Sequence, residues 1–274
     1  MTQPKAPVHA GPSKLSPVFE KCRAEGRAAL IGYLPVGYPT VEKSIESFET
    51  MVRAGCDIIE VGVPYSDPVM DGSTIQEAAD LALTNGVRVR DVFRAVEAIT
   101  AAGGNAVVMS YWNPVLQYGV DKFARDLAAA GGAGMITPNL IPEEGAAWHA
   151  ASDEFDLDRI YLVAPSSTTE RIALTVDASR GFVYVASTMG VTGARDAVSD
   201  AAPELCARVH EYSDIPLGVG LGVRNREQAS QIASYADGVI VGSALVTAAK
   251  AGQDHLADLV TELAAGVREP RADL

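Results

Sequence analysis

Cysteine is scarce in this chain of 274 residues, and the three that occur form no recognisable motif. Cys22, Cys56 and Cys206 are odd in number, widely separated and without C-x-x-C spacing, which argues against a disulfide framework. They are typical of reduced packing residues, so we expect a cytoplasmic protein. No apolar run reaches membrane-spanning length, and the first residues lack the apolar region of a signal peptide, so we expect no membrane association.

Basic residues are also in short supply, with 22 Lys and Arg against 35 Asp and Glu and a formal charge of -13. Binding to phosphate backbones depends on clustered Lys and Arg, so nucleic acid is not an expected partner. Aromatic residues make up only 6% of the chain, but hydrophobic residues make up 48%. This composition indicates a globular protein with many tight helix and strand contacts.

Lysine and histidine are absent from the ends of the predicted strands, where an α/β enzyme would use them. The six lysines fall in the N-terminal tail or in helical segments, which disfavours a Schiff-base aldolase. The four histidines are scattered without ligand spacing, so we expect no metal site. Carboxylates remain as the groups that could transfer protons.

Apolar segments with strand character alternate with amphipathic helical segments along the whole chain. This order requires a parallel sheet, either a closed barrel or an open doubly wound sheet. The strand count, the length and the lack of a linker favour an α/β fold with a single (β/α)8 TIM barrel and additional short helices. We expect a disordered extension over residues 1–14, the catalytic barrel over 15–267 and a tail over 268–274. The expected strands are 28–34, 57–62, 106–110, 134–137, 159–163, 182–186, 217–220 and 238–241.

The stretch 58–76, IIEVGVPYSDPVMDGSTIQ, contains three acidic residues around the end of the second strand. Period two places Glu60 on an inward face, where an unpaired carboxylate is costly and tends to keep a proton. Barrels place their chemistry at this end of the strands, so Glu60, Asp67 and Asp71 are candidates. The alternatives are a satisfied buried carboxylate for Glu60, a turn or a contact with a neighbouring chain for Asp67, and a turn for Asp71.

Tyrosine and glycine residues extend the candidate site to the later strands. Tyr184 shares its parity with the inward positions of strand 182–186, although an aromatic that only fills a core layer would look the same. Glycine-rich turns at 190–193, 220–222 and 242–243 follow three late strands. Such turns let backbone N–H groups approach an anion, and each also permits a merely tight loop. Together they predict a phosphorylated substrate.

These segments resemble the tryptophan synthase alpha subunit family. The resemblance rests on EVGVPYSDP at 60–68, the following Asp71-Gly72 and 74–76, and the turns at 190–193 and 242–244, and it spans nearly the whole chain. It implies a cofactor-free carbon–carbon lyase that cleaves indole-3-glycerol phosphate into indole and glyceraldehyde 3-phosphate. It also implies an α2β2 complex in which indole passes to a beta subunit that carries pyridoxal phosphate.

The resemblance assigns roles residue by residue. Glu60 matches the catalytic acid/base, Asp71 the carboxylate that accepts the indole N–H, and Tyr184 the third active-site group. Asp67 and Pro68 match the interface with the beta subunit. The positions that match substrate contacts are Tyr33, Ile75, Met109, Tyr111, Thr192, Gly193, Gly222, Gly242 and Ser243.

Two positions depart from the family pattern: Asn139 stands where Asp is frequent, and Leu221 where Phe is frequent. Other phosphate-binding barrels remain as alternatives, such as a sugar-phosphate epimerase or indole-3-glycerol phosphate synthase, although the synthase is expected to use a strand-end lysine. A non-catalytic barrel that binds phosphate and regulates a partner is a further alternative. Such a barrel would be expected to have lost Glu60 or Asp71, and both are present.

Overall fold

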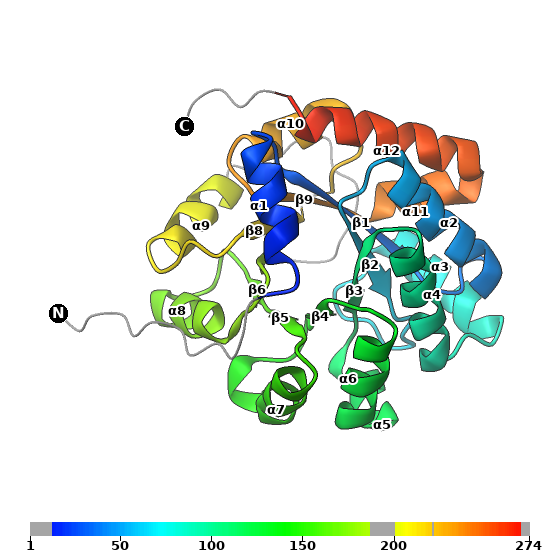
Figure 1. The fold of residues 1–274 in the computed structure, drawn as a ribbon, viewed down its shortest axis with the longest axis horizontal. Coiled ribbons are helices and arrows are strands. Elements are labelled where there is room, and N and C mark those ends of the chain that lie inside the picture. Colours follow the sequence, from blue (N-terminus) through cyan, green and yellow to red (C-terminus); the bar gives the residue numbers. More distant parts are fainter. Residues whose placement is uncertain (1–12, 187–200, 221, 270–274) are drawn as a thin grey trace.

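The computed structural model describes residues 13–186, 201–220 and 222–269. Its strands are all parallel and hydrogen-bonded in the order β5-β4-β3-β2-β1-β9-β8-β7-β6. Helices surround these strands (Figure 1). The strands are β1 Ala29–Pro35, β2 Ile58–Gly62, β3 Asn105–Met109, β4 Gly134–Ile136, β5 Asp158–Ile160, β6 Leu162–Val163, β7 Val183–Ala186, β8 Leu217–Gly220 and β9 Gly238–Val241.

The two strands at the ends of this order, β5 and β6, are consecutive in the chain and separated only by Tyr161. β5 pairs with β4 and β6 pairs with β7, and the Tyr161 carbonyl accepts a hydrogen bond from the Tyr184 N–H. They are therefore two halves of one strand position, which joins both sides of the sheet. The predicted (β/α)8 barrel is confirmed, with the single predicted strand 159–163 divided in the middle.

The helices follow the strands in the expected alternation. Thr40 caps the second helix by accepting the Lys43 N–H, and Gly55 ends that helix in the left-handed conformation. The helices are α1 Ser16–Ala24, α2 Val41–Ala54, α3 Ser73–Thr84, α4 Val89–Ala101, α5 Trp112–Tyr118, α6 Val120–Ala129, the 3₁₀ helix η1 Pro142–Glu144, α7 Ala146–Glu154, α8 Thr169–Ala178, α9 Ala201–His210, α10 Arg226–Ala233, α11 Ser243–Ala251 and α12 Gln253–Val267.

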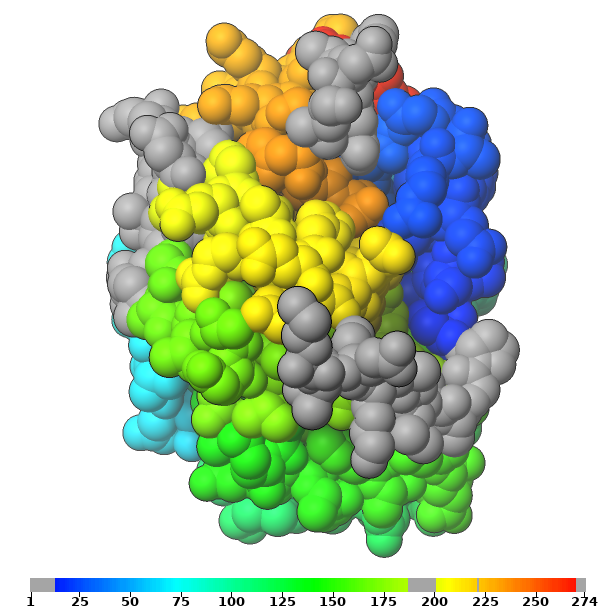
Figure 2. Space-filling view, turned by 90° about the vertical axis from the view of Figure 1, so that its left-hand side faces the viewer, coloured from blue at the N-terminus to red at the C-terminus, as the bar shows by residue number. Residues whose placement is uncertain are grey.

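Successive helices pack around the outside of the barrel. Figure 2 shows α8, α9 and α10 side by side along one flank, in chain order from green to orange. Their apolar faces meet the outward side chains of the strands in one large core. Within the described part of the chain, no helix combines the length and the hydrophobicity that crossing a membrane requires.

A second, smaller core fills the inside of the barrel and is sealed by α1. Ile31, Ile58 and Ile160 point inward from their strands and pack together with the side chains of α1. Phe19 of α1 lies against Phe182, with ring centroids 5.8 Å apart. Among the described residues the interior is therefore filled where α1 covers it, which leaves the carboxyl ends of the strands as the side where a ligand would enter.

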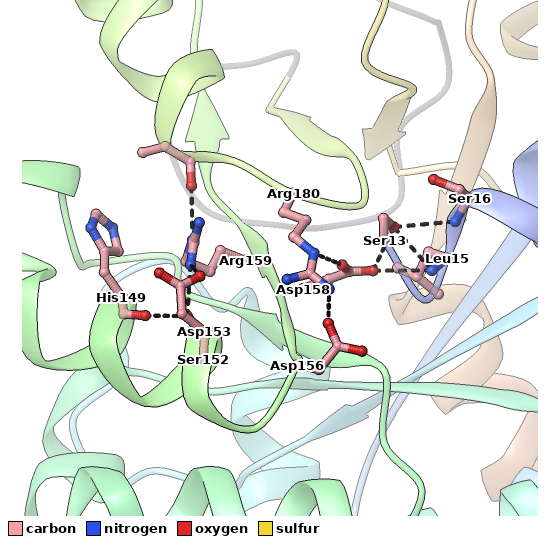
Figure 3. A network of polar contacts seen from close by, with 11 residues as sticks. Ser13, Leu15, Ser16, His149, Ser152, Asp153, Asp156, Asp158, Arg159 and Arg180 are labelled. Carbon is pink, nitrogen blue, oxygen red and sulfur yellow. Dashed lines mark hydrogen bonds and ion pairs between the residues drawn. The ribbon is translucent and has the colours of Figure 1, made fainter. Parts of the chain in front are cut away.

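A buried ion pair joins the chain near α1 to this interior (Figure 3). Asp158, at the first residue of β5, lies 3.0 Å from Arg180 Nε and accepts hydrogen bonds from Ser13 Oγ at 2.8 Å and Leu15 N at 3.0 Å. Arg180 also pairs with Asp156, at the surface. These contacts hold residues 13–15 against the barrel.

Candidate active site

Glu60 lies in the middle of β2 and points into the barrel, as its parity predicts. It is 1% exposed, and its Oε1 has no hydrogen-bond partner among the described residues. Burial alone raises the pKa of this carboxyl group to about 8. Glu60 therefore keeps a proton at neutral pH and loses it readily, which suits a group that must both give and take one.

Tyr184 also faces the interior, from β7. A β-carbon at Gly220 of β8 would collide with the Tyr184 hydroxyl, so the glycine leaves room for the ring to lean across the neighbouring strand. The pKa of Tyr184 is raised far above its usual value, first by burial and then by the negative charge of Glu60. Tyr184 therefore stays neutral and lies within electrostatic reach of Glu60.

Tyr33 of β1 has the same arrangement and is the register partner of Glu60 in β2. Its hydroxyl lies over Gly62 of β2, where a β-carbon would collide with it. Burial raises the pKa of Tyr33 well above its usual range, and the charges of Asp71, Glu60, Tyr111 and Tyr184 raise it further, in that order. The structure thus brings five predicted site residues into one interior space.

Asp71 lies in the loop between β2 and α3 and is half-buried. Its Oδ1 accepts a hydrogen bond of 3.0 Å from the Tyr111 hydroxyl, and its carbonyl accepts one of 2.7 Å from Gln76 Nε2. Burial raises the pKa of Asp71, and the Tyr111 hydrogen bond opposes that rise. Asp71 is therefore part of a defined structure, which goes beyond the simple turn that was the alternative.

The apolar candidates border the same space. Ile75 of α3 is 5% exposed, and a β-carbon at Gly242 would lie 3.8 Å from Ile75 and 3.5 Å from Tyr33. Met109 ends β3 in register with Gly62 of β2. These contacts outline an apolar wall beside the two carboxylates.

The late glycine turns are described in part. Gly242 caps α11 and Ser243 begins it, and the Leu245 and Val246 N–H groups bond to the Gly242 carbonyl. A helix N-terminus of this kind can meet an anion with its first N–H groups. Gly222 has a φ of 70°, in the left-handed region that favours glycine. Thr192, Gly193 and Leu221 lie outside the described residues.

The predicted partner contacts lie on the same loop as Asp71. Asp67 is exposed, and its Oδ2 accepts a hydrogen bond of 2.5 Å from Ser66 Oγ, which is the local turn contact that was its alternative. Pro68 is half-buried, and Val69 is 69% exposed. This loop presents a surface outward while Asp71 faces inward.

Residues after β3 support this loop, and two of them, Trp112 and Asn113, were not among the predicted site residues. The rings of Tyr65 and Tyr111 lie 5.2 Å apart, and Asn113 Nδ2 donates to the Tyr65 hydroxyl at 3.4 Å. Asn139 Oδ1 accepts the Trp112 N–H at 2.8 Å. Asn139, a departure from the family pattern, thus provides an acceptor that an aspartate could equally provide.

A sequence profile described as "Tryptophan synthase alpha chain" matches residues 19–272 of the chain. The chain belongs to the tryptophan synthase alpha chain family. The alpha chain of Mycobacterium marinum is 70% identical over 257 residues, which cover 94% of this chain and 96% of that one. The alpha chain of Nocardia farcinica is 71% identical, with 93% of this chain and 96% of that one covered.

Solved structures of tryptophan synthase alpha chains share this fold. A structure of tryptophan synthase from Mycobacterium tuberculosis superposes with a TM-score of 0.92 at 69% identity, covering 94% of this chain and 99% of that one. The tryptophan synthase A-subunit of Pyrococcus furiosus gives 0.79 at 31% identity, with coverage of 87% and 98%. Family membership thus agrees with the barrel and makes the chain a lyase of tryptophan biosynthesis.

Proposed function

We propose that Glu60, Asp71 and Tyr184 carry out the carbon–carbon lyase reaction of the tryptophan synthase alpha family in this chain. The family cleaves indole-3-glycerol phosphate into indole and glyceraldehyde 3-phosphate, and its alpha chains use no cofactor of their own. The observation that carries the proposal is the buried Glu60 carboxyl group, whose Oε1 finds no hydrogen-bond partner among the described residues.

The chemistry follows from the protonation states of the two carboxyl groups. The bond from indole C3 to the glycerol phosphate chain breaks readily once C3 is protonated, because the ring then accepts the bonding electrons. Glu60, with a pKa near 8, holds a proton at neutral pH that it can supply. Its carboxylate form can then accept the proton of the side-chain hydroxyl group next to the breaking bond.

Asp71 and Tyr184 complete this reaction. Protonation at C3 places a positive charge on the indole nitrogen, and an ionised Asp71 would stabilise it by accepting the N–H hydrogen bond. The neutral Tyr184 hydroxyl lies within electrostatic reach of Glu60 and can donate to its carboxylate form or to the substrate. Both effects favour the transition state over the bound substrate.

The remaining candidate residues fall into two groups, one for the indole ring of the substrate and one for its phosphate. Tyr33, Ile75 and Met109 would contact the apolar indole ring, because they form the apolar wall beside the two carboxyl groups. The phosphate would meet the backbone N–H groups at Gly242 and Ser243, where α11 begins. Gly222 and the predicted Thr192 and Gly193 would complete that phosphate site.

Residues 15–267 would act as one catalytic barrel in the cytoplasm, where the described cysteines, all buried and free, would stay reduced. The partner of the family's alpha chains is the beta subunit, which carries pyridoxal phosphate and receives indole. In this chain Asp67 and Pro68 would contact it, because they stand on the outer side of the loop that carries Asp71.

A direct assay tests the function. We expect the purified chain to release indole from indole-3-glycerol phosphate slowly, and faster when a beta subunit is added. The matched control is Glu60→Gln under both conditions. Phosphate-ligand binding without indole release would indicate a regulatory barrel, and conversion of a different sugar phosphate would indicate another enzyme.

A further inference from the structure

The Tyr111 hydroxyl group makes three hydrogen bonds to one short loop. Its oxygen accepts the backbone N–H groups of Val69 at 3.2 Å and Met70 at 3.0 Å. It also lies 3.0 Å from Asp71 Oδ1. Three consecutive residues of the loop between β2 and α3 are therefore bonded to one side-chain atom from the end of β3.

These bonds use the full capacity of a phenol group. A tyrosine hydroxyl has one proton and two acceptor lone pairs, and the two backbone N–H groups occupy both lone pairs. The proton must then point at Asp71, which accepts it best as a carboxylate. Tyr111 in this state has no hydrogen-bonding capacity left for the substrate.

Tyr111 is itself held firmly, so it can act as a fixed support. It is 5% exposed, and its ring lies against Tyr65. The residues on either side are bound to the strand and loop of β4, because Ser110 N bonds to the Ile136 carbonyl and Trp112 N bonds to Asn139 Oδ1. The loop that it supports, in contrast, carries the exposed Val69.

We propose that Tyr111 is a positioning residue, which holds Asp71 and the backbone of residues 69–71 in the geometry in which the carboxylate meets the substrate. This inference rests on the proposed role of Asp71. It differs from the pocket-lining role that the family resemblance implies for Tyr111, since the hydroxyl group, and not only the ring, is then required.

The electrostatic surroundings of Asp71 predict a signature of this role. Asp71, Glu60 from β2, Tyr184 from β7 and Tyr111 all act on Tyr33 of β1, so these titratable groups share one space. The hydrogen bond from Tyr111 lowers the pKa of Asp71 against the effect of burial. Removing that bond should raise the pKa of Asp71 and move the acidic limb of the rate profile to higher pH.

The first experiment compares Tyr111→Phe with wild type, using indole-3-glycerol phosphate from pH 5 to 9. We expect kcat to fall about tenfold to a hundredfold, the effect of one charge-assisted hydrogen bond, and the acidic limb to move upward. Affinity for glycerol phosphate, which carries no indole, should stay the same. Tyr118→Phe is the matched control, because it removes a tyrosine–carboxylate bond of 2.7 Å to Asp126 away from the site.

The second experiment follows hydrogen exchange in a peptide that spans residues 66–76. The amides of Val69 and Met70 should exchange faster in Tyr111→Phe than in wild type or Tyr118→Phe, since their acceptor is gone. Unchanged exchange would show that the Tyr111 hydroxyl group does not hold the backbone of residues 69–71. Faster exchange with an unchanged kcat and pH profile would show that this support has no role in catalysis. If the wild-type protein released no indole, the proposed function would be wrong. The exchange experiment would still test whether Tyr111 holds the backbone of residues 69–71.

Discussion

The carboxyl groups of Glu60 and Asp158 are both buried inside the barrel, but they have opposite surroundings. Asp158 meets Arg180, Ser13 and the Leu15 N–H. Glu60 has an oxygen without any partner in the part of the chain that the structure describes. One carboxyl group lies beside α1, where the interior is sealed, and the other lies below the loops where substrate would enter.

Burial raises the pKa of both groups, so the difference lies in what opposes burial. For Asp158 the Ser13 hydroxyl, the backbone and Arg180 all lower the pKa again. For Glu60 burial is the cause of the shift, and its pKa reaches about 8. A buried carboxylate that is paired with a cation and accepts hydrogen bonds holds structure together, whereas one that lacks a cation and keeps a labile proton is available for chemistry.

The largest expected effect is the loss of turnover when Glu60 is replaced. Glu60→Gln keeps the shape and polarity of the side chain but cannot carry the proton, so kcat should fall by about 10²–10⁴-fold. Binding of glycerol phosphate should change little. Steady-state indole release and inhibitor binding measure the two effects. Turnover within a few-fold of wild type would remove Glu60 from the mechanism.

The next largest expected effect is the loss of protein stability when Asp158 is replaced. Asp158→Ala removes the buried acceptor for Arg180, Ser13 and the Leu15 N–H, and should lower the free energy of unfolding by about 3–5 kcal/mol. Urea unfolding measures this change. The control is Asp156→Asn, which removes the charge of the exposed acid that pairs with the same guanidinium, suits the left-handed backbone at this position (φ 52°) and should cost less than about 1 kcal/mol. Equal losses in both variants would mean that burial does not set the strength of this pair.

The kcat of Asp158→Ala, measured at a temperature at which the variant is folded, tests whether Asp158 has a role in catalysis as well as in stability. Folded Asp158→Ala should turn over at nearly the wild-type rate, because Asp158 begins β5 beside α1, at the opposite end of the strands from the loops that carry the site. A large loss of kcat in the folded variant would show that the two ends of the barrel interior are coupled.

Glu60 and Asp158 also differ in how far their roles could be predicted from the sequence. Glu60 was found because its own strand has a clear period, and a carboxylate at an inward position is conspicuous. Asp158 was missed because its partner Arg180 is 22 residues away in the chain, and only the fold brings them together. Long-range contacts such as Tyr111 with Val69 leave no local pattern for the same reason.

Local rules also explain the errors and successes in the fold. The strands were predicted from apolar segments that the barrel buries on both faces. The sequence pattern does not indicate the short α5, because Pro114 disfavours a helix, although proline is tolerated in a first turn. The division of strand 159–163 at Tyr161 reflects how the strand changes neighbours from β4 to β7, which depends on barrel closure.

The smallest expected change in the free energy of unfolding is the contribution of Glu60, which depends on pH. In the unfolded chain Glu60 ionises near its usual pKa of 4.5, and in the folded chain only near 8. The folded state therefore binds this proton more tightly, and the stability that it contributes is complete below pH 4.5 and is lost as pH rises to about 8. Glu60→Gln has no such proton to lose.

Glu60→Gln and wild type should consequently be about equally stable at pH 4, and the variant should become the more stable of the two as pH rises. The difference should level off above pH 8 at no more than a few kcal/mol, which corresponds to a Tm several degrees higher. Calorimetric scans of both proteins at pH 4, 6 and 9 measure it. A variant that is less stable than wild type at pH 9 would mean that ionised Glu60 has partners in the folded protein, and the contrast with Asp158 would then disappear.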